Sequence, residues 1–146
     1  MKNLKTISEG LLDEGLDVRV SIRGRSMFPL IGAGDKITIS PEKKLVIGDI
    51  IVCKRGDRMV CHRLVRVFEK GGVKYYQTRG DSFFRLDEPV TSGHILGRVA
   101  KIERENVSLS RRILLLVHPI LKFGKINAYV IATLIKLKAI FPPTPR

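Results

Sequence analysis

The sequence predicts a mainly β protein, in which a compact antiparallel domain lies between a short N-terminal helix and an apolar, basic C-terminal helical tail. Residues 17–105 consist of short β-branched runs separated by turn-forming segments, which is typical of an antiparallel sheet. Residues 1–16 instead carry leucine and isoleucine at helical spacing, and residues 106–146 combine apolar stretches with lysine and arginine. We therefore expect one β domain with a helical extension at each end.

Local patterns define each element. Leu4, Ile7, Leu11 and Leu12 recur on one face of a helix, although Gly10 disfavours that conformation. The segments GAGD, RGD, EKGG and SGH supply turn residues between strands. Six strands are predicted: DVRVSI (17–22), KITIS (36–40), DIIVCKR (49–55), MVCHRLVRVFE (59–69), VKYYQTR (73–79) and HILGRVAKI (94–102).

The chain is strongly basic, with 27 Lys and Arg against 14 Asp and Glu and a formal net charge of +13. Such an excess indicates an anionic partner surface, either nucleic acid or acidic lipid. Residues 106–146 contain seven basic residues and no acidic one, so the excess is concentrated in the apolar tail. The β region lacks a basic platform interleaved with aromatic residues, so lipid is favoured and no nucleic-acid partner is expected.

The tail pattern predicts an interfacial helix over residues 113–140. Lysines interrupt its apolar run, which disfavours a membrane-spanning helix. Lys122, Lys125 and Lys136 fall on one arc of a helix opposite a wide apolar face, as in helices that lie among lipid headgroups. We therefore expect the protein at the cell membrane; the alternative is a helix packed on the β domain or on a partner subunit. No N-terminal anchor is expected, because residues 1–16 hold acidic residues and lack an apolar core.

Ser26, in RSMFPLI after a predicted strand, is the first candidate for chemistry. A serine between strands is usually a turn former, and its hydroxyl becomes a nucleophile only beside a base. The candidate bases are the lysines and three histidines, His62, His94 and His118. His62 lies on the predicted strand MVCHRLVRV, where it is either a hydrogen-bonded core residue or a proton acceptor.

Asp81 and Asp87 follow the next strand, in TRGDSFFRLDEPV. A histidine base needs a carboxylate on its second ring nitrogen to fix its orientation. The residues together form a Ser–His–Asp constellation in the order Ser26, His62, Asp87. No cofactor and no metal are expected, because the histidines are scattered and the cysteines lack a metal-ligand spacing.

Cys53 and Cys61 flank the turn at Gly56-Asp57 and could face each other across a hairpin. The commoner role for such cysteines is that of small buried hydrophobic residues, and we expect that role here.

Three segments resemble the successive conserved boxes of type I signal peptidases, in the branch of the endoplasmic reticulum and archaea that uses a histidine base. The resemblance covers about residues 18–100. The matching residues are Ser26-Met27-Phe28-Pro29 for Ser-Met-x-Pro, residues 48–52 for Gly-Asp-Ile-Ile-Val, His62-Arg63 for the base, Gly80-Asp81 with Asp87 for the third box, and Gly97-Arg98-Val99 for the closing strand.

This resemblance implies a β domain of the signal peptidase and LexA-like type. It also implies a serine endopeptidase that cleaves signal or leader peptides from pre-proteins after a small residue. Ser26 would be the nucleophile, His62 the general base and Asp87 the residue that orients the histidine. Met27 and Phe28 would line the substrate cleft, and the Ser26 N–H would help to bind the oxyanion.

The sequence departs from the family pattern where Ser82 replaces the asparagine of the third box. Asp81 is expected to tie this box to backbone or to Arg79 rather than to take part in chemistry. Two other functions remain open: a non-catalytic basic module at a membrane surface, and a self-cleaving regulator of the LexA type. A LexA-like regulator would need a lysine at position 62 and a cleavable bond upstream of Ser26, where residues 1–25 offer only Glu9-Gly10, Glu14-Gly15 and Arg23-Gly24.

Overall fold

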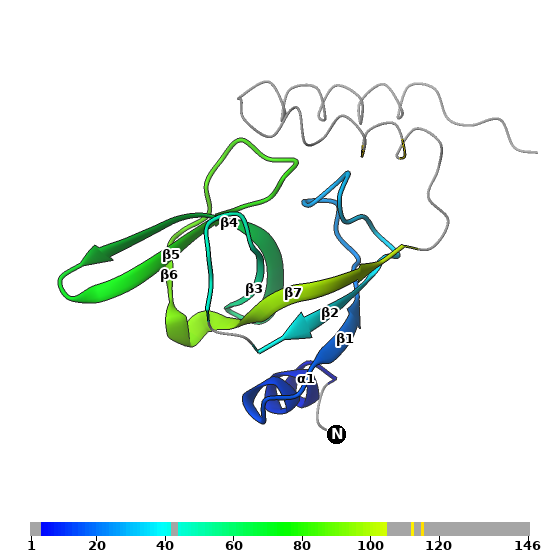
Figure 1. The fold of residues 1–146 in the computed structure, drawn as a ribbon, viewed down its shortest axis with the longest axis horizontal. Coiled ribbons are helices and arrows are strands. Elements are labelled where there is room, and N and C mark those ends of the chain that lie inside the picture. The colour runs from blue at the N-terminus through cyan, green and yellow to red at the C-terminus, as the bar shows by residue number, and fades with distance from the viewer. Residues whose placement is uncertain (1–3, 42–43, 105–111, 113–114, 116–146) are drawn as a thin grey trace, which may run out of the picture.

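The computed structural model describes residues 4–41, 44–104, 112 and 115. Within these residues, seven strands form one sheet in the order β1-β2-β7-β3-β4-β5-β6, and every neighbouring pair is antiparallel (Figure 1). The prediction of a mainly β, antiparallel domain with a short helix is confirmed. The elements are α1 (Leu4–Asp13), β1 (Val18–Ser21), β2 (Lys36–Ser40), β3 (Ile50–Arg55), β4 (Arg58–Lys70), β5 (Val73–Arg79), β6 (Val90–Thr91), the 3-10 helix η1 (Ser92–His94) and β7 (Ile95–Glu103).

The six predicted strands correspond to β1, β2, β3, β4, β5 and β7. Each predicted end agrees with the observed end or differs from it by one residue. The predicted helix is also present, and Gly15 terminates it with a positive φ of 83°. The Gly15 N–H donates to Leu12 O at 3.1 Å, and the Leu16 N–H donates to Leu11 O at 2.9 Å. This pair of hydrogen bonds satisfies carbonyls at the helix end as in a Schellman motif. The missed strand, β6, has two residues and is too short for a periodic pattern.

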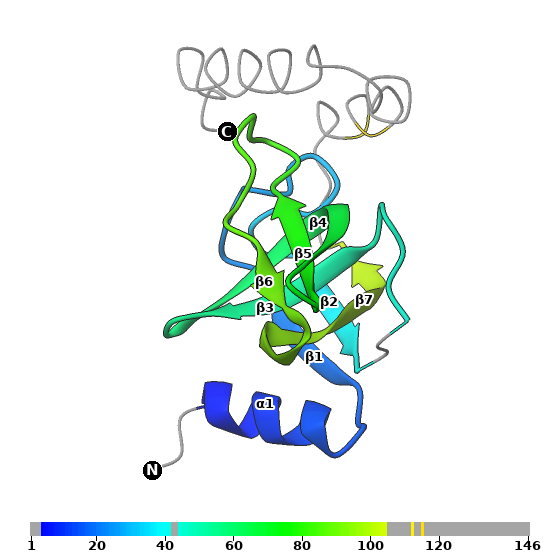
Figure 2. The same ribbon diagram turned by 90° about the vertical axis from the view of Figure 1, so that its left-hand side faces the viewer.

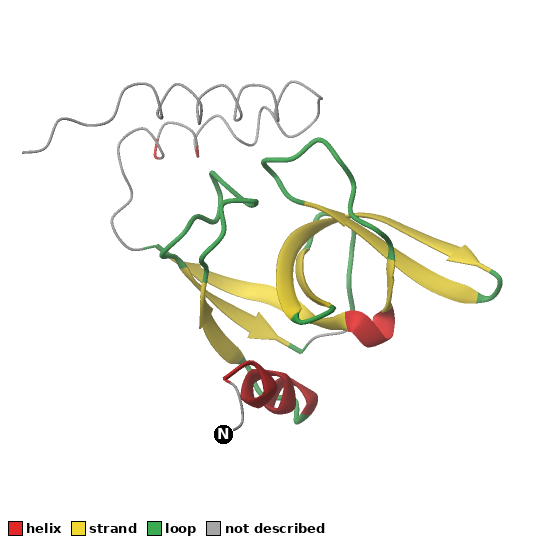
Figure 3. Ribbon diagram, turned by 180° about the vertical axis from the view of Figure 1, so that it is seen from behind, coloured by secondary structure: helices red, strands yellow, loops and turns green. Residues whose placement is uncertain are grey.

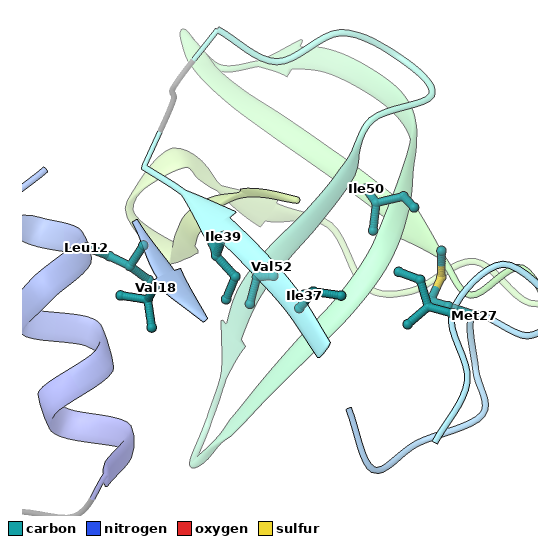
Figure 4. Close-up of a cluster of buried hydrophobic side chains, with 8 residues drawn as sticks. Leu12, Val18, Met27, Ile37, Ile39, Ile50 and Val52 are labelled. Carbon is teal, nitrogen blue, oxygen red and sulfur yellow. The ribbon is translucent and has the colours of Figure 1, made fainter. Parts of the chain in front are cut away.

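β3 is buried on both faces because it separates two hydrophobic clusters. Ile50 and Val52 belong to the first cluster, which also contains Met27 of the loop after β1 and Leu12 of α1 (Figure 4). The alternate residues of β3, such as Ile51, pack into the second cluster with residues of β4 and β6. Side chains at successive strand positions point to opposite faces, so one strand serves both clusters.

Among the described residues, the unpaired strand edges include those of β1 and of the first part of β4. β1 is the terminal strand of the sheet and pairs only with β2. β4 is 13 residues long, but its pairing with β5 begins at Arg63. Residues 58–62 therefore pair with β3 alone, so they leave the other side of the strand open.

Cys53 and Cys61 are free cysteines and do not face each other. Cys53 is paired with Val60, and Cys61 is paired with Val52, so the two side chains point to opposite faces of the hairpin. Burial raises the pKa of the Cys53 thiol to about 11 and that of the Cys61 thiol to about 12. The role of small buried hydrophobic residues fits this placement, and the alternative of a cross-hairpin pair does not.

The predicted tail at residues 106–146, including Lys122, Lys125 and Lys136, lies outside the described residues apart from Arg112 and Leu115. In the part of the chain that the structure describes, no helix is both long enough and apolar enough to cross a membrane.

Candidate active site

Ser26 lies on a loop of residues 22–35 between β1 and β2, hereafter the Ser26 loop. This loop and the loop of residues 80–89, hereafter the 80–89 loop, lie at one end of the sheet, and α1 lies at the other (Figure 1 and Figure 2). The Ile22 N–H donates to Asp35 O at 2.8 Å and so closes the base of the Ser26 loop. Met27 is 3% exposed and anchors the loop in the first cluster, whereas Ser26 itself is half-buried.

Ser82 fastens the 80–89 loop to the Ser26 loop. Its N–H donates to Ser26 O at 2.9 Å. Its hydroxyl lies 3.0 Å from Arg25 O and 2.9 Å from Phe28 O, so its single hydrogen is donated to one of these two carbonyls, which lie on either side of Ser26. The serine that replaces the expected asparagine therefore keeps the third box joined to the segment around Ser26.

His62 and Asp87 form a close pair. Nδ1 of His62 lies 2.6 Å from Oδ2 of Asp87, and His62 is buried on β4. An ionised carboxylate only accepts hydrogen bonds, so Nδ1 carries the hydrogen and Nε2 is left with a lone pair. The Thr78 hydroxyl donates to the same Oδ2 at 2.6 Å, and the Asp87 N–H donates to Thr78 O at 2.9 Å. Gln77 Nε2 donates to Asp87 O at 3.1 Å, so β5 fixes both the backbone and the carboxylate of Asp87.

Gly80 lies between the Ser26 loop and the imidazole. A methyl group at Gly80 would stand 2.8 Å from Ser26 O and 3.1 Å from His62 Nε2, which is closer than real Cβ contacts. The Phe83 ring meets His62 edge-on, with centroids 6.3 Å apart and an interplanar angle of 81°. These contacts place the 80–89 loop against the Nε2 side of His62, where a proton would be accepted.

Asp81 is held by Arg63, a partner other than the backbone or Arg79 that the sequence suggested. Its carboxylate accepts two hydrogen bonds from Arg63, at 2.8 Å from Nε and 2.6 Å from Nη2. Arg63 also donates to Gly48 O at 2.7 Å. Arg63 follows His62 on β4, so through Arg63 this bidentate pair joins the 80–89 loop to the backbone at Gly48, next to His62.

Ser26 and His62 line one cleft of about 440 Å³. Its lining comes from the end of β1 and the residues after it, from β2 and β3, and from the first half of β4. Figure 3 shows the loops at this end of the sheet. Met27 lines the cleft as expected. Phe28 is not among the lining residues, and its carbonyl accepts a hydrogen bond from Ser82. His94 of η1 is also absent from the lining, and its Nδ1 lies 3.1 Å from Oγ1 of Thr91 at the end of β6.

The arrangement contains the parts that nucleophilic catalysis requires: a partly exposed hydroxyl, and an imidazole in the same cleft with a carboxylate on its far nitrogen. The model of one protein family, described as Peptidase S24-like, matches residues 3–76. The chain belongs to the Peptidase S24-like family. This membership assigns it broadly to the serine peptidases, with the β fold described above. The match includes Ser26 and His62 but ends before Asp87, whose candidacy rests on the resemblance of its segment to the third box and on its contact with His62. No curated protein matches the chain.

Sequence reasoning missed two contacts of the site. Thr78 is 1% exposed, and no feature of VKYYQTR marked it out from an ordinary strand residue. Arg55 ends β3, and its Nη2 lies 2.7 Å from Glu88 O and 3.4 Å from Thr78 Oγ1. Both residues contact Asp87 or its neighbours only because the 80–89 loop folds back along β5.

Proposed function

We propose that this protein is a serine endopeptidase of the signal-peptidase type, which cleaves signal or leader peptides from pre-proteins after a small residue. Ser26 Oγ attacks the scissile carbonyl, and His62 Nε2 accepts its proton and later gives it to the leaving amine. Asp87 holds the His62 tautomer and stabilises the imidazolium. The observation that carries the proposal is the 2.6 Å contact between His62 and Asp87 at a cleft that Ser26 also lines.

The Ser26 N–H is the proposed donor to the oxyanion. No described residue accepts a hydrogen bond from it, so it can donate to the developing charge. The Ser82 hydroxyl is not proposed as a second donor, because it is occupied by the carbonyls of Arg25 and Phe28.

The unpaired edges of β1 and β4 are suited to bind a substrate peptide in extended conformation. Residues of both strands and of the segment after β1, Val20–Gly24 and Met59–His62, line the cleft. A peptide in extended conformation can add to such edges through main-chain hydrogen bonds, which bind it largely independently of its sequence. The resemblance to type I signal peptidases supports a small residue before the scissile bond.

We further propose attachment to the cell membrane through the basic, apolar tail. Each basic residue near anionic lipid contributes about 1 kcal/mol at low salt. Binding to vesicles of anionic lipid should therefore weaken as salt rises, and Lys122→Glu, Lys125→Glu and Lys136→Glu together should release the protein. Retention on vesicles that is insensitive to salt would contradict this mode of attachment, and a tail that docks on a partner subunit would leave vesicles unbound at any salt.

The test of the proposed function is mass spectrometry of pre-proteins with small-residue cleavage sites after incubation with the purified protein. Cleavage is expected at one bond, and Ser26→Ala should reduce the rate by several orders of magnitude with the fold retained. Ser92→Ala, in the exposed η1, is the matched control and should cleave normally. Cleavage by a folded Ser26→Ala protein would overturn the proposal, and so would the absence of any product with the wild type.

Self-cleavage is a second candidate, because membership of the Peptidase S24-like family is equally compatible with a LexA-like regulator. The bond Glu9-Gly10 lies within α1 and Glu14-Gly15 in the turn after it, at the end of the sheet opposite to the Ser26 loop (Figure 2). The third bond, Arg23-Gly24, lies in the Ser26 loop, and both of its residues line the cleft. The first two positions favour a separate substrate chain, and Arg23-Gly24 is the bond to examine for self-cleavage. Intact mass of the wild type incubated alone distinguishes the two: loss of an N-terminal fragment that Ser26→Ala does not show would establish self-cleavage.

A further inference from the structure

We propose that Thr78 is a positioning residue of this site, and that Arg55 acts on Asp87 through it. The inference rests on the proposed function, since it concerns how Asp87 is held for its role beside His62. Thr78 is almost fully buried on β5 and lies outside the cleft lining, so it does not touch a substrate. Its effect on the reaction must therefore pass through Asp87.

The directions of the hydrogen bonds are fixed by chemistry. Oδ2 of Asp87 lies 2.6 Å from both His62 Nδ1 and Thr78 Oγ1, and a carboxylate can only accept. The Thr78 hydroxyl has one hydrogen, which it gives to Asp87, and its lone pairs are left toward Arg55 Nη2 at 3.4 Å. A guanidinium, a hydroxyl, a carboxylate and an imidazole thus form a directed chain.

Two consequences follow for Asp87. Its carboxylate is 21% exposed and could turn toward water, but the second donor holds Oδ2 in line with His62. The hydrogen bond from Thr78 and the positive charge of Arg55 also withdraw negative charge from Asp87, which limits how strongly Asp87 favours the imidazolium. Thr78 therefore keeps the carboxylate of Asp87 in line with Nδ1 of His62, and Arg55 helps to orient the Thr78 hydroxyl that donates to it.

Other charged groups face the pair from the surrounding elements. Cys53 of β3 lies close enough for Arg55 to lower its pKa and Asp87 to raise it, against a larger rise caused by burial. The Asp81 charge is neutralised by Arg63 in a bidentate pair. The remaining groups are the exposed Arg79 at the end of β5 and the exposed Glu88 beside Asp87. None of these donates a hydrogen bond to Oδ2 of Asp87, so Thr78 and Arg55 are the residues to vary.

The experiment measures kcat, KM and the pH–rate profile for cleavage of a pre-protein by Thr78→Val, Thr78→Ser and Arg55→Gln. Loss of a hydrogen bond to a charged group should lower kcat of Thr78→Val by about tenfold or more, with KM unchanged because Thr78 lies outside the cleft. The acid limb of the profile should move to higher pH in Thr78→Val and Arg55→Gln. Thr78→Ser keeps the hydroxyl and should restore both kcat and the profile.

Thr38→Val, on β2, is the matched control for loss of a threonine hydroxyl from a strand, and it should leave all three quantities unchanged. Wild-type kcat and profile in a folded Thr78→Val protein would overturn the proposal. Equal loss in Thr78→Ser would also overturn it, since size and not the hydroxyl would then matter. Should Thr78→Val fail to fold, the other two variants still test the proposal. Thr78→Ser should then keep the wild-type pH–rate profile and Arg55→Gln should change it, and any other result would overturn the proposal.

A readout without substrate separates this inference from the proposed function. Nitrogen-15 NMR of the His62 ring reports which nitrogen carries the hydrogen and the pH at which the ring titrates. We expect the Nδ1–H form in the wild type and titration at higher pH in Thr78→Val. An Nε2–H ring, or an unchanged titration, would overturn the inference even if the protein cleaves peptides; the expected spectra in a protein that cleaves nothing would overturn only the proposed function.

Discussion

Gly80 lies against the imidazole of His62, so closely that a methyl group on Gly80 would stand 3.1 Å from Nε2. The same methyl group would stand 2.8 Å from Ser26 O, which is backbone and cannot move aside without shifting the Ser26 loop. The glycine of the third box is thus required by space between the two residues proposed for catalysis.

Gly80→Ala should therefore lower kcat/KM by about a hundredfold or more, since small displacements of catalytic groups have effects of this size. Unfolding free energy should fall by only about 1–3 kcal/mol, as for overpacking elsewhere. Gly93→Ala is the control, because no atom lies within 4 Å of its added methyl group. Both are measured by cleavage kinetics and urea unfolding; normal activity of Gly80→Ala would show that His62 and Ser26 are placed differently during the reaction.

Ser82→Ala should loosen the Ser26 loop. The variant loses a hydroxyl that donates to Arg25 O or Phe28 O, but it keeps the N–H bond to Ser26 O. The expected loss of stability is about 1 kcal/mol, with kcat/KM reduced by roughly tenfold because the nucleophile is less firmly placed. Urea unfolding and cleavage kinetics measure the two effects. If stability falls and activity does not, Ser82 supports the fold alone.

Breaking the Arg63–Asp81 pair should destabilise the protein strongly. The two side chains are 12% and 7% exposed, so removal of one leaves the other charge largely buried. Asp81→Asn or Arg63→Met should each lower the unfolding free energy by about 3–5 kcal/mol. The exposed pair Lys101–Glu103 is the comparison, and Lys101→Ala should cost less than about 1 kcal/mol. Similar losses for both pairs would mean that water reaches Arg63 and Asp81.

The raised pKa values of the Cys53 and Cys61 thiols should make the folded protein less stable at alkaline pH. Their pKa values in the folded protein are raised to about 11 and about 12, above the range of about 8.5 for a free cysteine. In the unfolded chain the thiols lose their protons first, so stability is full below that range and falls as pH rises toward the folded values. Between pH 8 and pH 10, the free energy of unfolding measured with urea should decline more steeply in the wild type than in the double variant that carries both Cys53→Ala and Cys61→Ala. Parallel declines would contradict the raised values.

The strands could be predicted because each is a β-branched run bounded by Gly, Asp or Ser, and those signals are local. The partner of Asp81 could not be predicted. Arg63 and Arg79 are opposite each other in the β4–β5 register, so the sequence offers two arginines, and the path of the 80–89 loop decides between them. The contact of Thr78 with Asp87 depends on the same path. Ser26 and His62 could be singled out because the segments around them resemble the boxes of type I signal peptidases, whereas the residues that hold Asp87 carry no such pattern.

The unpaired edges of β1 and β4 also make the protein prone to self-association. Exposed strand edges pair readily with another copy of the same chain. Charged side chains on an edge disfavour such pairing, and in the unpaired residues 58–62 of β4 the only Lys, Arg, Asp or Glu is Arg58. The formal net charge of +13 keeps identical molecules apart through mutual repulsion. Salt weakens that repulsion, so colloidal stability of the purified protein should decline in concentrated salt, and an inert peptide that occupies the edges should restore it.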